Sequence, residues 1–180
     1  MTRVAIQGVI GSYSEEAARE ILGVRVTVIE CHDFDETFSA VRLGHAETAV
    51  VPVENKIVGD ISRPLELLDA GHYRVLDRLT MKVRHVLAGT ADATLENLAS
   101  VRSHIEALKQ CRSFLTANAH LRQVIGADTA SSIKRIVDEG DPANGAIGSA
   151  RAARLYGARI LAENIADDRD NWTTFYLIGN

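Results

Sequence analysis

Hydrophobic residues along the chain form short runs that alternate with longer amphipathic segments. The apolar runs at 4–6, 26–30 and 48–53 are typical of buried strands. Between them, segments 14–21 and 35–43 are predicted as helices, the first capped by Ser12 or Ser14. The first part of the chain therefore predicts strand–helix–strand units.

A second series of the same kind follows after residue 100. Asp128 or Thr129 is expected to cap one of its helices, and Gly157 to close another. Alternation of this kind is typical of an α/β fold with largely parallel sheets. The predicted elements are strands at 101–103, 123–127, 146–147, 159–164 and 173–178, and helices at 105–115, 129–137 and 150–156.

The stretch 73–88 is extended and lacks a helical period, which is the pattern of a strand that crosses between two lobes. We therefore predict a two-lobed α/β protein in which each lobe is a mostly parallel sheet flanked by helices. Residues 1–78 with 160–180 form the first predicted lobe, and residues 79–159 form the second.

The composition narrows the classes of partner. The 180 residues carry a formal net charge of −4 with a pI near 5.9, which favours neither nucleic acid nor an anionic membrane as partner. No run approaches ~18 apolar residues, and the N-terminus has no signal core. Cys31 and Cys111 suggest neither a disulfide framework nor a metal site, so we expect a reduced, cytoplasmic protein.

Three polar segments, 8–15, 51–60 and 103–111, interrupt the pattern at the ends of predicted strands. Ligands of open α/β sheets bind at the carboxyl ends of strands, where helix N-termini offer free N–H groups to anions. The first segment also fits a plain helix cap, and the second fits a solvated turn. In the third, Ser103 is a candidate cap, and His104 is better explained as a capping residue than as a metal ligand.

Taken together, these segments resemble the prephenate dehydratase catalytic domain, from about Val4 to the C-terminus. Each short match is weak evidence for the family by itself, and the resemblance rests on their shared order and spacing. The pieces are Gly8-x-x-Gly11-Ser12-Tyr13-Ser14-Glu15, Thr37-Phe38-x-Ala40-Val41, Val51-Pro52-Val53-Glu54-Asn55 with Gly59, Ser103-His104, Ala107-Leu108-x-Gln110-Cys111, Asp128-Thr129-Ala130, Ala146-Ile147-Gly148-Ser149, Ala152-Ala153-x-x-Tyr156-Gly157, Asn171-x-Thr173 and Phe175.

The resemblance implies a lyase of phenylalanine biosynthesis that converts prephenate to phenylpyruvate with loss of water and carbon dioxide. It implies a fold like that of type 2 periplasmic binding proteins, with the active site between the lobes. It implies no metal and no organic cofactor, because formation of the aromatic ring drives the reaction.

The resemblance also assigns roles to single residues. Thr173 is the implied hydrogen-bond donor to the departing hydroxyl, and Phe175 shapes the wall around the ring. Asn55, Ser103 and Gln110 are the implied contacts to substrate polar groups. The segments expected to line the carboxylate sites contain Ser12, Ser14, Thr129 and Ala130.

The chain departs from the family pattern at two positions. The family's Thr-Arg-Phe motif reads Thr173-Thr174-Phe175 here, and threonine cannot replace a guanidinium that pairs with a carboxylate. Lys56 follows Asn55 where the family often has serine. We hypothesise that Lys56 partly replaces the lost charge, and we include Glu54, Lys56 and Thr174 among the substrate-binding candidates; a solvated loop lysine is the simpler alternative.

The departures leave two other functions open. A prephenate decarboxylase-like enzyme would lose carbon dioxide without expelling hydroxide, and a non-catalytic binder of small carboxylates would use the same fold. The sequence does not separate prephenate from arogenate as substrate. No C-terminal regulatory domain is recognised, so no feedback inhibition by phenylalanine is expected, and the family favours a homodimer.

Overall fold

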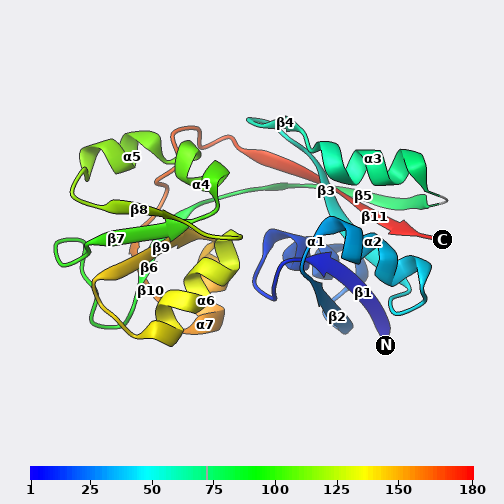
Figure 1. The fold of residues 1–180 in the computed structure, drawn as a ribbon, viewed down its shortest axis with the longest axis horizontal. Helices are drawn as coiled ribbons and strands as arrows, with labels where there is room; N and C mark the ends of the chain where they lie inside the picture. Colours follow the sequence, from blue (N-terminus) through cyan, green and yellow to red (C-terminus); the bar gives the residue numbers. More distant parts are fainter. Residues whose placement is uncertain (72) are drawn as a thin grey trace. The chain divides into compact units, whose positions relative to one another are not determined.

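The computed structural model describes residues 1–71 and 73–180, which divide into two units (Figure 1). Unit 1 comprises Met1–Val83 and Asn171–Asn180, and unit 2 comprises Arg84–Asp170. The predicted boundaries, at 78/79 and 159/160, lie inside strands. The observed division differs from them because the strand that contains residue 78 continues to Lys82, and the strand that begins at Arg159 pairs within unit 2.

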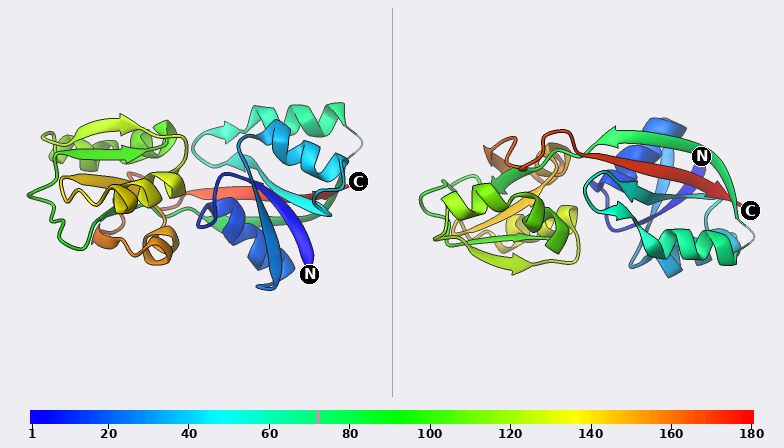
Figure 2. Two further views of the ribbon diagram at one scale, coloured as in Figure 1. Left: turned by 60° about the horizontal axis from the view of Figure 1, so that its bottom comes forward. Right: turned by 90° about the horizontal axis from the view of Figure 1, so that it is seen from above.

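Unit 1 is built on one sheet in the order β2-β1-β3-β11-β5, with β4 beside β3. β1–β2 and β1–β3 are parallel pairs, whereas β11 runs antiparallel to both β3 and β5. Figure 2 shows the long strands β11 and β5 lying alongside each other in both views. The strands are β1 Thr2–Gln7, β2 Val26–Cys31, β3 Thr48–Asn55, β4 Gly59–Asp60, β5 Arg74–Lys82 and β11 Trp172–Gly179.

Helices cover both faces of this sheet. Helix α1 (Tyr13–Leu22) packs Ala17 and Ala18 against one face, in a cluster that contains Phe175. Helices α2 (Phe34–Arg42) and α3 (Ser62–Ala70) contribute to a second cluster on the other face. Strand side chains alternate between faces, so successive residues of β11 take part in different clusters.

Unit 2 has its own sheet, in the order β10-β6-β9-β7-β8. Its main hydrophobic cluster joins the sheet to α4 and α5, and the buried Ile133 and Ile136 of α6 pack at β9 and β7. The elements are β6 Val86–Gly89, β7 Ser100–Ser103, α4 Ile105–Gln110, α5 Arg112–Ala117, β8 Arg122–Ile125, α6 Thr129–Glu139, β9 Asn144–Gly148, α7 Ala150–Tyr156 and β10 Arg159–Ala162.

The α/β class with two helix-flanked sheets is confirmed, but both sheets are mixed rather than mostly parallel. In unit 2, β7 pairs in parallel with β8 and β9, while β6 pairs antiparallel with β9 and β10. Apart from the short pair β3–β4, each antiparallel pair involves β5, β6, β10 or β11, the strands that flank the two crossings between the units.

Several local predictions are also confirmed. Ser12 caps α1, Asp128 caps α6, and Gly157 ends α7 with φ +74°, a left-handed conformation that suits glycine. The predicted helix 105–115 is two helices, because the chain leaves helical geometry at Cys111, where φ is −109° and ψ is 28°.

Three features of the described residues bear on the class of protein: helix length, clusters of possible metal ligands, and the state of the cysteines. Among residues 1–71 and 73–180, no helix combines the length and apolarity needed to cross a membrane. Within the same ranges, no three His, Cys, Asp or Glu side chains gather as metal ligands would. Cys31 and Cys111 are free thiols buried in different units, and burial raises the pKa of Cys111 to about 12.

Candidate functional site

Three strand ends meet at one edge of the unit 1 sheet. β1 and β3 are parallel, so both end at this edge, and the antiparallel β11 begins there. Asn55, the last residue of β3, lies opposite Thr173 in the strand register. Segment 51–60, for which a solvated turn was one interpretation, therefore continues strand β3 as far as Asn55.

The Asn55 side chain is the centre of a polar network at this edge. Its Nδ2 atom donates to Asn171 Oδ1 at 2.8 Å, to Thr173 Oγ1 at 2.9 Å and to the Trp172 carbonyl at 3.1 Å. Its Oδ1 atom accepts from the backbone N–H groups of Ile57 and Val58, both at 3.0 Å.

These bonds fix the orientation of the amide. A backbone N–H can only donate, so the Asn55 atom facing Ile57 and Val58 must be the oxygen. The atom facing Thr173 is therefore the amide nitrogen, and Thr173 Oγ1 accepts. Among the described residues, no acceptor takes the Thr173 hydroxyl proton, so the hydroxyl keeps one donor for a ligand.

The next two motif residues lie on opposite faces of the sheet. Thr174 Oγ1 is 3.0 Å from Thr80 Oγ1 on the neighbouring β5 strand, and its side chain is buried. Phe175 is 2% exposed and packs in the hydrophobic cluster beneath α1. Its ring thus supports the strand that carries Thr173, and its assignment to the wall around the substrate stays a prediction.

The glycine loop after β1 does not present the free N–H groups that its sequence suggested. The backbone N–H of Ile10 donates to Glu30 Oε1 at 2.6 Å, and that of Gly11 to Glu15 Oε2 at 3.2 Å. Ser12 Oγ accepts from the Glu15 N–H as the helix cap. Nearby carboxylates therefore occupy two of the donors that were predicted to be free, and the assignment of Ser12 and Ser14 to substrate binding stays a prediction. The side chain of Ser14 is buried in the first turn of α1.

Glu54 and Lys56 flank Asn55 and are both exposed. The backbone N–H of Lys56 donates to the Trp172 carbonyl at 2.9 Å, which ties the residue to the start of β11. Lys56 is therefore anchored through its backbone beside the Asn55 network.

Ser103 in unit 2 is fully buried at the end of β7 and donates its hydroxyl proton to the Ile147 carbonyl at 2.7 Å. It does not cap the following helix. His104 caps that helix instead, since its Nδ1 accepts from the Glu106 N–H. This confirms the prediction that His104 is a capping residue.

Gln110 ends α4 and bonds to a buried histidine. Its Oε1 lies 2.8 Å from His85 Nε2, and His85 is 3% exposed. Burial lowers the pKa of His85, which keeps the ring neutral near neutral pH, although the bond to Gln110 acts in the opposite direction.

Thr129 and Ala130 begin α6 in unit 2. Thr129 is partly buried and Ala130 is 1% exposed, so the methyl group of Ala130 belongs to the interior. Only the backbone of Ala130 could contribute polar contacts to a ligand.

Comparison with known proteins identifies the family. The prephenate dehydratase family model matches residues 4–180. This chain belongs to the prephenate dehydratase family. It is 37% identical over 176 residues to arogenate dehydratase/prephenate dehydratase 2, chloroplastic, of Arabidopsis thaliana, covering 98% of this chain and 46% of that protein. The chain thus spans about half the length of the curated relatives it matches.

Solved structures agree with the family fold. The prephenate dehydratase of Arthrobacter aurescens, solved in complex with L-Phe, has a TM-score of 0.90 and 26% identity, over 99% of this chain and 60% of that one. GqqA, a novel type of quorum quenching acylase, has a TM-score of 0.84 and 32% identity, over 99% of this chain and 64% of that one.

Within unit 1 of this prephenate dehydratase fold, only some of the residues predicted from the sequence are brought together. Asn55 and Thr173 are in direct contact, and Lys56 is tied to the same edge. Sequence reasoning missed Asn171 as a site residue, although it is fully buried and accepts from Asn55. Asn171 directly precedes β11, and its Oδ1 atom and Thr173 Oγ1 both accept from Asn55 Nδ2.

Proposed function

We propose that this chain is a lyase that converts prephenate to phenylpyruvate, with loss of water and carbon dioxide. The Thr173 hydroxyl carries the proposal: its oxygen is held by Asn55, and its proton is directed to a ligand. The membership of the chain in the prephenate dehydratase family supports the substrate class.

The chemistry needs few protein groups. As the ring carboxylate leaves as carbon dioxide, its bonding electron pair moves into the ring and the carbon–oxygen bond to the ring hydroxyl breaks. The departing hydroxide takes up a proton and leaves as water. A hydroxyl donor aimed at this oxygen stabilises the negative charge that develops on it, and one such donor is typically worth ~2.7–4 kcal/mol.

The test is a turnover assay of the purified chain with prephenate. Phenylpyruvate, which absorbs strongly in alkali, should accumulate together with one equivalent of carbon dioxide. Release of carbon dioxide without phenylpyruvate would instead indicate a decarboxylase, and saturable prephenate binding without turnover would indicate a carboxylate binder. Either result would overturn the proposal.

Arogenate is the second candidate substrate. The Arabidopsis relative is named for both arogenate and prephenate, which differ by an amino group in place of the side-chain carbonyl. A comparison of kcat/KM for the two compounds decides which of them is the better substrate.

We also propose that the chain forms a homodimer through the edge strand β5. One side of β5 has no partner strand among the described residues, and Val75 and Leu76 are 51% and 52% exposed. Light scattering should give twice the chain mass, and Leu76→Asp should halve it. Val24→Asp, at a residue that is 77% exposed elsewhere, is the matched control.

A cytoplasmic location is part of the proposal. Two buried free thiols fit a reducing compartment. Fractionation of cells that express the protein tests this location, and recovery from another compartment would contradict it.

A further inference from the structure

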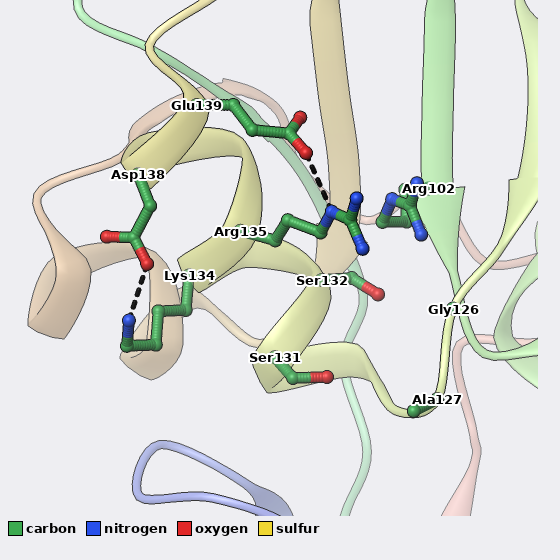
Figure 3. Close-up of a pocket in the computed structure, with 9 residues that line it drawn as sticks. All are labelled: Arg102, Gly126, Ala127, Ser131, Ser132, Lys134, Arg135, Asp138 and Glu139. Atoms are coloured by element: carbon green, nitrogen blue, oxygen red, sulfur yellow. Dashed lines mark hydrogen bonds and ion pairs between the residues drawn. The ribbon is translucent and has the colours of Figure 1, made fainter.

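A pocket of about 440 Å³ in unit 2 contains none of the residues predicted to bind substrate. Strand β7 contributes one lining residue, the loop after β8 contributes two, and α6 contributes the others (Figure 3). The lining residues are Arg102, Gly126, Ala127, Ser131, Ser132, Lys134, Arg135, Asp138 and Glu139.

The charges of this pocket do not cancel. Lys134 pairs with Asp138, and Arg135 Nε donates to Glu139 Oε1 at 2.7 Å. Arg102 has no hydrogen-bond or ion-pair partner in the part of the chain that the structure describes. Three cations against two carboxylates leave a net charge of +1 on the pocket lining.

Arg102 and Arg135 line the same pocket despite their like charges. In Figure 3 the terminal nitrogens of Arg135 point toward the Arg102 guanidinium, while its Nε faces Glu139. Adjacent guanidinium groups repel each other, and an oxyanion that accepts from both turns this repulsion into two charge-assisted bonds. The fork of N–H donors on each guanidinium matches the oxygens of such an anion.

Close packing holds Arg102 in place. A Cβ atom added to Gly126 would lie 2.4 Å from Ser132 Oγ and 3.2 Å from Arg102 Cγ. The aliphatic stem of Arg102 therefore packs against the loop after β8. A smaller neighbouring cavity of about 130 Å³ shares Arg102 and Glu139 and adds Arg122, which extends the positive lining.

The side chains, rather than the N-terminus of α6, supply the donors. The Asp128 carboxylate already accepts from the Ser131 N–H at 2.7 Å, so it occupies one backbone donor and adds a negative charge there. The Ser131 hydroxyl donates to the Asp128 carbonyl at 3.5 Å, and Lys134 points toward Asp138, away from the arginines (Figure 3). The remaining donors are the two guanidinium groups, Arg102 from β7 and Arg135 from α6.

We propose that this pocket binds a phosphate group, either as inorganic phosphate or as the phosphate of a small phosphomonoester. Two guanidinium groups that approach from β7 and from α6 offer more N–H donors than the two coplanar oxygens of a carboxylate can pair with, and they suit the several oxygens of a tetrahedral dianion better. The site is independent of the proposed dehydratase activity.

Calorimetric titration of the wild-type chain with sodium phosphate, at constant ionic strength in chloride, tests the proposal. Arg102→Gln and Arg135→Gln should each weaken binding at least about tenfold, because each removes a charged donor. Glu139→Gln should strengthen binding about threefold, because it removes a competing anion and releases Arg135 Nε.

Matched controls are Arg154→Gln and Glu163→Gln, which change exposed residues outside the pocket and should leave binding unchanged. Melting temperatures show whether each variant is folded, and the opposite signs expected for Arg135→Gln and Glu139→Gln separate binding from general damage.

Phenyl phosphate that binds more tightly than phosphate indicates an ester ligand, and equal affinities indicate the free ion. Three results would overturn the proposal: phosphate shows no saturable binding, Arg102→Gln and Arg154→Gln have equal effects, or malonate binds more tightly than phosphate.

Discussion

Thr173 in unit 1 and Ser103 in unit 2 are both buried hydroxyl residues near a strand end, but they use their protons in opposite ways. Thr173 accepts from the Asn55 amide and keeps its proton for a ligand. Ser103 gives its proton to the Ile147 carbonyl and is fully enclosed. The family motif marks both residues equally, and only the hydrogen-bond partners separate a hydroxyl that can donate from one that ties two strands together.

The largest expected difference between the two hydroxyls is that caused by Thr173→Val, which keeps the shape of the side chain and removes its donor. We expect kcat for prephenate to fall about 10²–10³-fold, the typical cost of one lost donor to a developing oxyanion. Thr173→Ser should retain most of the rate. Thr80→Val, on the opposite face of the same sheet, is the control, and an equal loss there would contradict the assignment.

Ser103→Ala should affect stability more than catalysis. Loss of the hydroxyl leaves the Ile147 carbonyl without this donor in a buried position, so we expect the free energy of unfolding to fall by about 1–3 kcal/mol. Urea denaturation measures this change, with the exposed Ser113→Ala as control. A loss of kcat as large as that of Thr173→Val, at unchanged stability, would remove the distinction between the two hydroxyls.

His85 gives unit 2 a dependence on pH. Because burial lowers the pKa of His85 in the folded chain below its ordinary 6.5, the unfolded chain binds more protons just below that pH. The free energy of unfolding should therefore decrease as the pH falls below 6.5 and should level off above it. Denaturation of the wild type and His85→Gln at roughly pH 5.5 and 7.5 should show the smaller decrease in the variant. Exposed His120→Gln should behave as the wild type, and equal slopes for all three proteins would contradict the assignment.

The smallest expected effect concerns Lys56. If its charge attracts a substrate carboxylate, Lys56→Ala should raise KM roughly threefold and leave kcat nearly unchanged, because exposed charges contribute little. Lys109→Ala, which removes an exposed lysine of unit 2, is the reference. A rise in KM no larger than that of the reference rules the role out.

The local features of the fold were predictable because they depend on neighbouring residues. Apolar runs, the caps at Ser12 and Asp128, and the ending at Gly157 were each present in a few consecutive positions. Sheet order was not predictable in this way. The insertion of β11 between β3 and β5 joins segments that lie far apart in the sequence, and it makes the sheet mixed.

The candidate site was predictable in its residue types but not in its bonding. The motif pointed to Asn55 and Thr173, yet only the positions of the Ile57 and Val58 N–H groups show which way the Asn55 amide faces. The loop N–H groups at Ile10 and Gly11 were expected to be free because Glu30, twenty residues from Ile10, could not be placed beside them from sequence alone.

A double-mutant cycle between Asn55 and Thr173 tests the central claim most directly. Asn55→Asp keeps the oxygen that accepts from the loop but replaces the amide donor with a carboxylate oxygen, which would draw the Thr173 proton away from the substrate. We predict that Asn55→Asp lowers kcat/KM for prephenate and that it causes no further loss when Thr173 is already valine. Losses that multiply in the double variant would show that the two side chains act independently, and would contradict the account.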